Sequence, residues 1–161
     1  MTAPSTTATR HLDEVAVGEK RPELAIALTR TVIVATAIAS RDYQDVHHDP
    51  GLAVERGSKD IFMNILSSNG FVGRYVTDWS GPGGVIENVS IRLGAPNYPG
   101  DTMVLTGRVT AAGVPDGRTD GRGVVEIAVR GANRLGDHLT GTVRVSLPVS
   151  TDGAPLTGAT R

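Results

Sequence analysis

The sequence predicts an α+β fold in which an antiparallel sheet wraps around one long central helix. Apolar residues in 64–79 recur at three- and four-residue steps, which is the spacing of a helix with one buried face. After Gly84 the apolar residues alternate with polar ones in four segments, as in strands with one buried face. The chain has 161 residues and no linker divides its body, so we expect one domain.

Three elements are expected before the long helix. Residues 23–28 (ELAIAL) are expected to form a strand, and residues 32–42 (VIVATAIASRD) a helix. A short helix is expected over 49–57. Asp49 suits its N-cap, Pro50 suits the first helical position and Gly57 suits a C-terminal stop.

The segment 64–79 has the strongest helical pattern in the chain. Its apolar positions are Ile65, Leu66, Val72, Tyr75, Val76 and Trp79. Small residues lie between them, namely Ser67, Ser68, Gly70 and Gly73. Because a glycine in an exposed helix only costs stability, the two glycines predict a close approach to another backbone. The turn at 80–84 (SGPGG) is expected to end the helix.

The strands expected after this turn cover 85–93, 102–111, 123–132 and 138–148. A sheet that curls around one long helix is the hot-dog arrangement; the alternative is a sandwich with separate helical and sheet layers. We expect the hot-dog domain to cover 13–149. Small polar residues dominate both ends, so segments 1–12 and 150–161 are predicted to be disordered.

Charge and cysteine content exclude several classes of function. With 16 basic and 17 acidic residues, no strong overall field draws the chain toward nucleic acid or an anionic membrane. The absence of cysteine excludes disulfides, thiolate catalysis and zinc–cysteine sites, and fits a reducing cytoplasm. The longest apolar run, 32–39, is shorter than the roughly 20 residues of a membrane-spanning helix. We therefore expect a soluble, cytoplasmic protein that binds neither nucleic acid nor membrane.

Residues 40–50 (SRDYQDVHHDP) form the one dense cluster of ionisable side chains. The sequence has no G-x-S-x-G motif and no P-loop, so neither that type of serine hydrolase nor a nucleotide site is supported. In one interpretation the cluster is a solvated loop whose acidic residues cap helices. In another it binds a metal, although adjacent side chains point in different directions. The ligands of that metal would be His47, His48 and Asp49, joined by His11 or His138.

In a third interpretation Asp42 and His47 form an acid–base pair. A carboxylate and an imidazole are the usual pair for moving protons near neutral pH. On one continuous helix these residues would lie about 140° apart. They converge only if the helix ends near Asp42 and the chain doubles back, while the neighbouring His48 points elsewhere.

Four segments, RDYQDVHHDP, GSKDIFMNILSSNG, RYVTDWSG and GAPNYPGDT, resemble the MaoC-like family of (R)-specific enoyl-CoA hydratases. The resemblance covers about residues 20–147 and is strongest to the small subunits of heteromeric steroid side-chain hydratases of cholesterol-degrading bacteria. It implies a hot-dog fold, with Asp42 and His47 as the catalytic dyad. Three positions depart from the family pattern, with Gln44 for its usual Asn, Asp45 for its usual Pro and Asn64 for its frequent Gly.

The resemblance also implies roles for the departing residues and for other molecules. The Gln44 amide is expected to orient the dyad or a water, and the Asn64 backbone N–H to polarise the thioester carbonyl. The implied reaction is hydration of an enoyl-CoA thioester without metal or cofactor. The implied substrate is an acyl-CoA of cholesterol catabolism, namely a steroid side-chain enoyl-CoA. The implied partner is a second MaoC-like subunit in a heterodimer or heterotetramer, with a homodimer as the alternative.

Two other functions stay open at the level of sequence. A hot-dog acyl-CoA thioesterase would use a carboxylate on or near the central helix, where Asp78 is the only one. A non-catalytic acyl-binding subunit of a heteromeric complex would be expected to have lost one member of the dyad, whereas this chain keeps both Asp42 and His47.

Overall fold

The computed structural model describes residues 8–150 and has the predicted α+β architecture. Its elements in chain order are a 3-10 helix η1 (Leu12–Glu14), β1 (Leu24–Leu28), α1 (Arg30–Ala39), a second 3-10 helix η2 (Asp45–His47), α2 (Pro50–Glu55), α3 (Ile65–Ser80), β2 (Val85–Leu93), β3 (Asp101–Gly113), β4 (Arg122–Asn133) and β5 (Gly136–Pro148). Every helix and strand expected from the sequence is present, with boundaries shifted by a few residues. Within residues 8–150 no helix is long and apolar enough to span a membrane.

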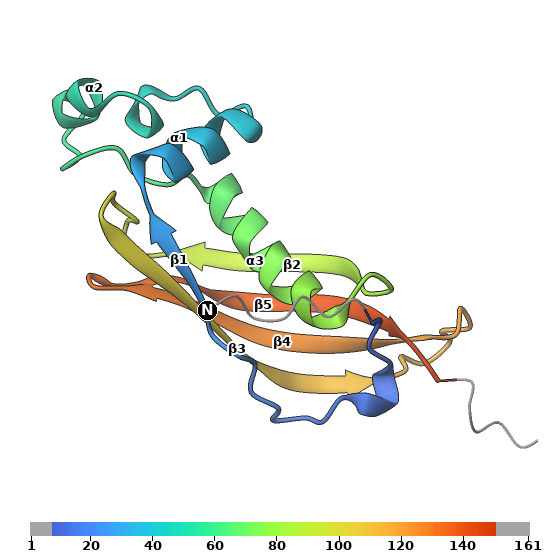
Figure 1. The fold of residues 1–161 in the computed structure, drawn as a ribbon. Coiled ribbons are helices and arrows are strands. Elements are labelled where there is room, and N and C mark those ends of the chain that lie inside the picture. Colours follow the sequence, from blue (N-terminus) through green and yellow to red (C-terminus); the bar gives the residue numbers. More distant parts are fainter. Residues whose placement is uncertain (1–7, 151–161) are drawn as a thin grey trace, which may run out of the picture.

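The five strands form one antiparallel sheet in the order β1–β3–β4–β5–β2, so β1 and β2 are its edges. Figure 1 shows α3 lying across one face of this sheet, with α1 and α2 beyond the end at which α3 begins. This is the predicted hot-dog arrangement. Because the loop between α1 and α2 lies near the start of α3, the polar cluster at 40–50 meets the first turn of the central helix.

The hydrophobic core lies between α3 and the sheet. Val72 and Val76 of α3 are fully buried, and Tyr75 is 2% exposed. They pack with alternate residues of the long strands, including Val125 and Ile127 of β4. The helix ends at Gly81, whose φ of 71° lies in the left-handed region and whose Cβ, if present, would collide with the Ala8 backbone. The glycine in this turn is therefore required by the backbone.

The predicted close approach of another backbone to Gly70 and Gly73 is wrong within this chain. A Cβ on Gly70 would meet no atom within 4 Å, and the nearest atom to one on Gly73 is the Cδ1 of Ile86 at 3.9 Å. Gly70 instead lines a groove of about 320 Å³ between α1 and α3, beside Leu66 and Phe71. Periodicity indicated the buried face of the helix but not what lies over its other face.

Residues 8–12 belong to the segment predicted to be disordered, yet they contact the body of the domain. The Arg10 N–H donates to the Ser80 carbonyl at 2.9 Å, and its guanidinium pairs with Glu19 at 2.6 Å. The same guanidinium lies 4.8 Å from the ring centroid of Trp79. Residues 8–12 therefore pack against the end of α3 and the segment before β1. The rest of that segment, 1–7, and the tail at 151–161 lie outside the described residues.

Candidate active site

The backbone doubles back at the end of α1, as the acid–base interpretation requires. Arg41 has a φ of 56° and is the one non-glycine residue in the left-handed region within residues 8–150. The Arg41 N–H donates to the Ile38 carbonyl at 2.9 Å, and the Asp42 N–H to the Ala37 carbonyl at 3.0 Å. This pair of bonds is a Schellman motif, which ends the helix and redirects the chain. Asp42 is thus fixed just beyond the helix by the bonds that terminate it.

The turn brings Asp42 and His47 together. The Nε2 atom of His47 lies 3.5 Å from the Oδ2 atom of Asp42. This separation exceeds that of a good direct hydrogen bond, and two groups so placed can both contact one water molecule. The His47 side chain is 8% exposed and that of Asp42 is 20% exposed. The pair is therefore largely shielded from solvent but reachable from one side.

The tautomer of neutral His47 follows from its second contact. Its Nδ1 atom lies 2.7 Å from the carbonyl oxygen of Phe62, which can only accept, so Nδ1 carries the hydrogen. The Phe62 ring also packs edge-on against the imidazole, with 4.9 Å between ring centroids. Nε2 is left with a free lone pair that faces Asp42. This nitrogen is the atom through which His47 can accept or return a proton.

Asp42 is held in its ionised form by hydrogen bonds. The Nδ2 atom of Asn64 donates to Oδ2 at 2.8 Å, and the Gln44 backbone N–H donates to Oδ1 at 3.3 Å. The bond from Asn64 is the largest cause of a lowered pKa at Asp42. Burial, the next largest effect, raises the pKa, and the Gln44 N–H and then the charges of His47 and His48 lower it further. At neutral pH Asp42 is therefore a carboxylate that accepts hydrogen bonds.

The dyad lies in a pocket of about 250 Å³. One wall is formed by residues 62–65, at the start of α3, and the other by residues 93–96, at the end of β2 and just beyond it. Most of these side chains are apolar. His138 of β5 completes the lining beside Asp42 and His47. The pocket thus combines a carboxylate and an imidazole, side chains that can transfer protons, with a mostly apolar lining.

The two predicted substrate-binding residues occupy different positions. The Gln44 side chain is exposed and does not line the pocket; Gln44 contacts the dyad through its backbone N–H and through its carbonyl, which accepts from the His47 N–H at 3.0 Å. Asn64 lines the pocket and is the N-cap of α3. Its backbone N–H has no acceptor among residues 8–150 and lies at the positive end of the helix dipole.

The other polar residues of the cluster have structural contacts. The sequence predicts that His48 points away from the dyad. In the structure its Nε2 atom instead donates to the Asp42 carbonyl at 2.7 Å, so His48 holds the main chain of Asp42. Asp49 caps α2 by accepting from two backbone N–H groups, and Asp45 pairs with Arg56 at 2.7 Å. Across residues 8–150 no group of three or more histidine, aspartate or glutamate side chains is arranged to hold a metal ion.

His138 is a pocket residue that the acid–base interpretation did not include. It is 2% exposed; its Nδ1 lies 2.7 Å from the Ala95 carbonyl and its Nε2 lies 2.8 Å from the Ser68 hydroxyl. Strand alternation would place His138 on the outer face with Thr140. Between β4 and β5, however, the pairing skips His138, and this β-bulge lets both His138 and Leu139 be buried. Strict alternation in the sequence gave no signal of that bulge.

We expect His138 to make folding stability depend on pH. Burial lowers the pKa of folded His138 below its ordinary 6.5, so on acidification the unfolded chain takes up this proton first. The free energy of unfolding should fall as the pH drops below about 6.5, by at most about 1.4 kcal/mol per pH unit for one proton. Denaturant titrations should find this slope reduced in His138→Gln. If the free energy of unfolding had the same pH dependence in both proteins, His138 would not be its source.

Comparisons with known proteins agree with this fold. No protein-family model matches the sequence. Over 131 residues the chain is 50% identical to the beta subunit of a 3-oxo-4,17-pregnadiene-20-carboxyl-CoA hydratase from Mycobacterium tuberculosis, which covers 81% of this chain and 95% of the relative. A chain in the crystal structure of the ChsH1–ChsH2 complex from the same organism has 49% identity and a TM-score of 0.74, covering 82% of this chain and 98% of that one.

A more distant neighbour shares the fold alone. The MaoC-like dehydratase from Rhodospirillum rubrum is 21% identical with a TM-score of 0.73, covering 88% of this chain and 98% of that one. The identity to the M. tuberculosis subunit extends over nearly all of that relative, and the shared fold agrees with it. The chain therefore belongs to the MaoC-like family of enoyl-CoA hydratases.

Proposed function

We propose that this hydratase adds water across the 2,3 double bond of an enoyl-CoA thioester, with Asp42 and His47 as its catalytic dyad. The observation that carries the proposal is the 3.5 Å approach of His47 Nε2 to Asp42 Oδ2 inside the pocket. The Phe62 carbonyl fixes the tautomer of His47, and the Asn64 amide keeps Asp42 ionised. Both reactive atoms can therefore accept a hydrogen from the same water.

The reaction needs water activated at C3, a proton delivered to C2 and a place for negative charge on the thioester oxygen. Asp42 and His47 bind one water; one of them takes a proton from it as the water oxygen bonds to C3, and the pair then returns a proton to C2. The electrons of the double bond shift toward the thioester oxygen, which then bears enolate charge. The free Asn64 N–H and the start of α3 suit that oxygen, and removing one such donor commonly costs roughly 10²–10³ in rate.

The proposed acyl group is that of a steroid side chain. The name of the 50% identical relative describes hydration of a pregnadiene-carboxyl-CoA, which is a four-ring acyl thioester. The pocket of this chain holds about 250 Å³, whereas pockets for drug-sized ligands have roughly 300–1,000 Å³. A four-ring group together with the CoA thioester is expected to need more room than this pocket offers. The remaining space is therefore assigned to a neighbouring subunit.

The proposed neighbour is a second MaoC-like chain, in a heterodimer or heterotetramer. The related chain of known structure is part of a complex of two different proteins, ChsH1 and ChsH2. In this chain β2 is an edge strand, and edge strands are usually paired or covered. Ile65 and Leu66, at the start of α3, are 47% and 48% exposed, so apolar surface adjoins the pocket. A homodimer is the alternative outcome.

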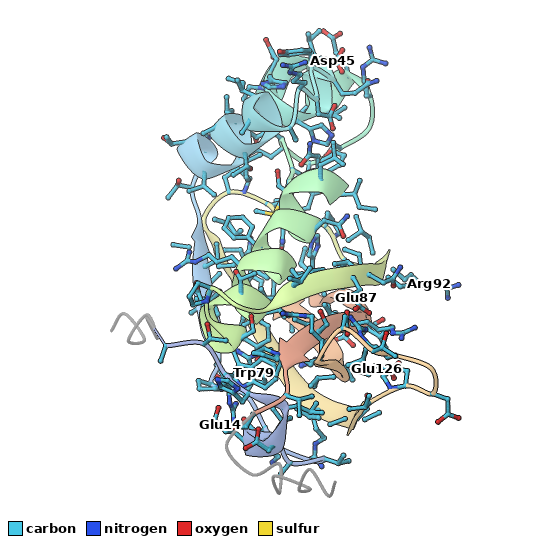
Figure 2. All side chains as sticks on the ribbon, turned by 90° about the vertical axis from the view of Figure 1, so that its right-hand side faces the viewer. Glu14, Asp45, Trp79, Glu87, Arg92 and Glu126 are labelled. Atoms are coloured by element: carbon cyan, nitrogen blue, oxygen red, sulfur yellow. The ribbon has the colours of Figure 1, made fainter. Side chains whose placement is uncertain are left out.

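The position of Asp78 does not favour the thioesterase alternative. Asp78 lies near the far end of α3, half-exposed, and the Arg74 guanidinium lies 3.3 Å from it. Figure 2 shows Trp79, the next residue after Asp78, in the lower half of the molecule, well separated from Asp45 at the top. Within residues 8–150 the pocket of the dyad has only one carboxylate, that of Asp42.

The proposed function is tested by following the loss of enoyl-thioester absorbance. The chain, alone and with a candidate MaoC-like partner, is assayed on a short straight-chain substrate and on a steroid enoyl-CoA. The expected product, identified by mass spectrometry, is the hydrated thioester. Release of free CoA without hydration would indicate a thioesterase and overturn the proposal.

We also expect activity to survive removal of metal ions. The proposed chemistry uses proton transfer by Asp42 and His47 and hydrogen bonding by a backbone N–H, and none of these steps uses a metal. Dialysis against a strong chelator should leave turnover unchanged. Loss of turnover that added zinc restores would instead support a metal site at His47, His48 and Asp49.

A further inference from the structure

The Asn64 side chain makes four hydrogen-bond contacts with three different parts of the site. Its Nδ2 donates to Asp42 Oδ2 at 2.8 Å and to the Ser40 hydroxyl at 3.0 Å. Its Oδ1 accepts from the Ser67 backbone N–H at 2.8 Å and from the Ser67 hydroxyl. The residue is 3% exposed. Every hydrogen-bonding capacity of the amide is used, and the contacts join the end of α1, the dyad and the first turn of α3.

The chemistry of these partners fixes which way the amide faces. Ser67 presents a backbone N–H, which can only donate, so the amide oxygen must face it. Asp42 is a carboxylate, which can only accept, so the NH₂ group must face Asp42. Ser40 already donates its hydroxyl hydrogen to carbonyls of α1, which leaves its oxygen free to accept. A reversed amide would lose the bonds to Ser67, in the first turn of α3, and to Asp42, just beyond the end of α1.

No other side chain in residues 8–150 donates a hydrogen bond to the Asp42 carboxylate. The second donor is the Gln44 backbone N–H, at the longer distance of 3.3 Å, and the Gln44 amide itself is exposed. His47 faces the same Oδ2 atom at 3.5 Å. The Asn64 amide thus holds one side of Oδ2 while the dyad partner faces it from another.

We propose that the Asn64 side chain is the positioning residue of the dyad, orienting the Asp42 carboxylate toward His47 while it caps α3. The role is additional to that of the Asn64 backbone N–H and rests on the proposed function of the dyad. One residue would then serve two steps of the reaction, because its side chain orients the Asp42 carboxylate and its backbone N–H is the proposed donor to the thioester oxygen. The cap and the carboxylate contact use different atoms of the amide, so substitution can separate them.

Asn64→Asp and Asn64→Ser make that separation. Both keep an oxygen that can accept from the Ser67 N–H, and aspartate and serine are good N-caps. Both remove the Nδ2 group that donates to Asp42; serine has only a hydroxyl on a shorter side chain, and aspartate adds a like charge. We expect kcat for hydration to fall roughly 10- to 100-fold in Asn64→Ser, as for a slightly misplaced catalytic group, and further in Asn64→Asp. The pKa of Asp42 should rise in both variants.

The experiment measures turnover of the assembled enzyme and, in the full chain, the pKa of Asp42 by carboxyl carbon NMR titration. Asn69→Ser is the matched control, because Asn69 bonds the Ile65 carbonyl on the same helix and makes no contact with the dyad. Thermal melting of every variant identifies any loss of fold. If Asn64→Ser unfolds, Asn64→Asp, which retains the isosteric cap, carries the test.

The outcomes distinguish the positioning role of Asn64 from the catalytic role of Asp42 and His47. A raised Asp42 pKa together with lowered kcat supports the positioning role, whereas a lower melting temperature with both quantities unchanged assigns Asn64 to the helix cap alone and overturns it. Asp42→Asn is measured in parallel. Should Asp42→Asn leave hydration intact, the proposed function of the dyad fails, whatever the pKa of Asp42 does in the Asn64 variants.

Discussion

His47→Ala and Asp42→Asn are each expected to lower the rate constant for hydration by at least about 10², the low end for a positioned acid or base. Alanine removes the nitrogen that faces Asp42, and asparagine replaces an accepting carboxylate oxygen with an amide of the same shape. Because both groups act on a water and not on the CoA moiety, the loss should appear in kcat more than in KM. The rate is measured with saturating enoyl-CoA on the assembled enzyme.

Two neighbouring substitutions make this test specific. Asp45→Asn changes an acidic residue of the same loop whose partner is the exposed Arg56, so turnover should stay close to that of the unchanged protein. His48→Ala removes a bond to the Asp42 main chain and should cost less than His47→Ala. If His48→Ala proved the most damaging of the set, the reacting imidazole would be His48 and the motif would be displaced by one residue.

The second large effect expected is the dependence of steroid hydration on a partner chain. The pocket that contains the dyad holds about 250 Å³, which is less than the roughly 300–1,000 Å³ of pockets for drug-sized ligands. The isolated chain should therefore hydrate a steroid enoyl-CoA weakly or not at all. Addition of a second MaoC-like chain should raise that activity by orders of magnitude. Co-purification and light scattering would detect the complex, and titration of the partner against activity would give its stoichiometry.

A short straight-chain enoyl-CoA serves as the control substrate, because a small acyl group makes less demand on the size of the pocket. Its hydration should depend less on the partner than hydration of the steroid does. Full activity of the isolated chain on both substrates, with no gain from a partner, would contradict the steroid-subunit proposal. It would leave hydration by Asp42 and His47 in place.

Local patterns were enough to predict the framework of the domain. Three- and four-residue spacing located α3, alternation located the four strands after it, and Asp49 with Pro50 marked the start of α2. The pairing of Asp42 with His47 was predicted with a condition, that the helix ends near Asp42 and the chain doubles back. Arg41 meets that condition with a left-handed φ of 56°, a conformation that sequence patterns seldom indicate at an arginine.

The residues that could not be predicted owe their roles to tertiary contacts. Asn64 was identified for its backbone N–H, but its amide reaches Asp42 only because the end of α1 packs beside the start of α3. His138 enters the pocket through a bulge that alternation does not reveal. The exposed face of Gly70 likewise depends on what covers α3, and no pattern within one chain specifies that.

The measurement that tests the central claim most directly is a double-mutant cycle between Asp42 and His47 in the assembled enzyme. If the two side chains act as one unit on one water, the losses in kcat are not additive. The double variant Asp42→Asn/His47→Ala should then hydrate enoyl-CoA about as fast as the slower single variant. Losses that multiply, or a double variant as fast as the unchanged protein, would contradict the shared-water dyad.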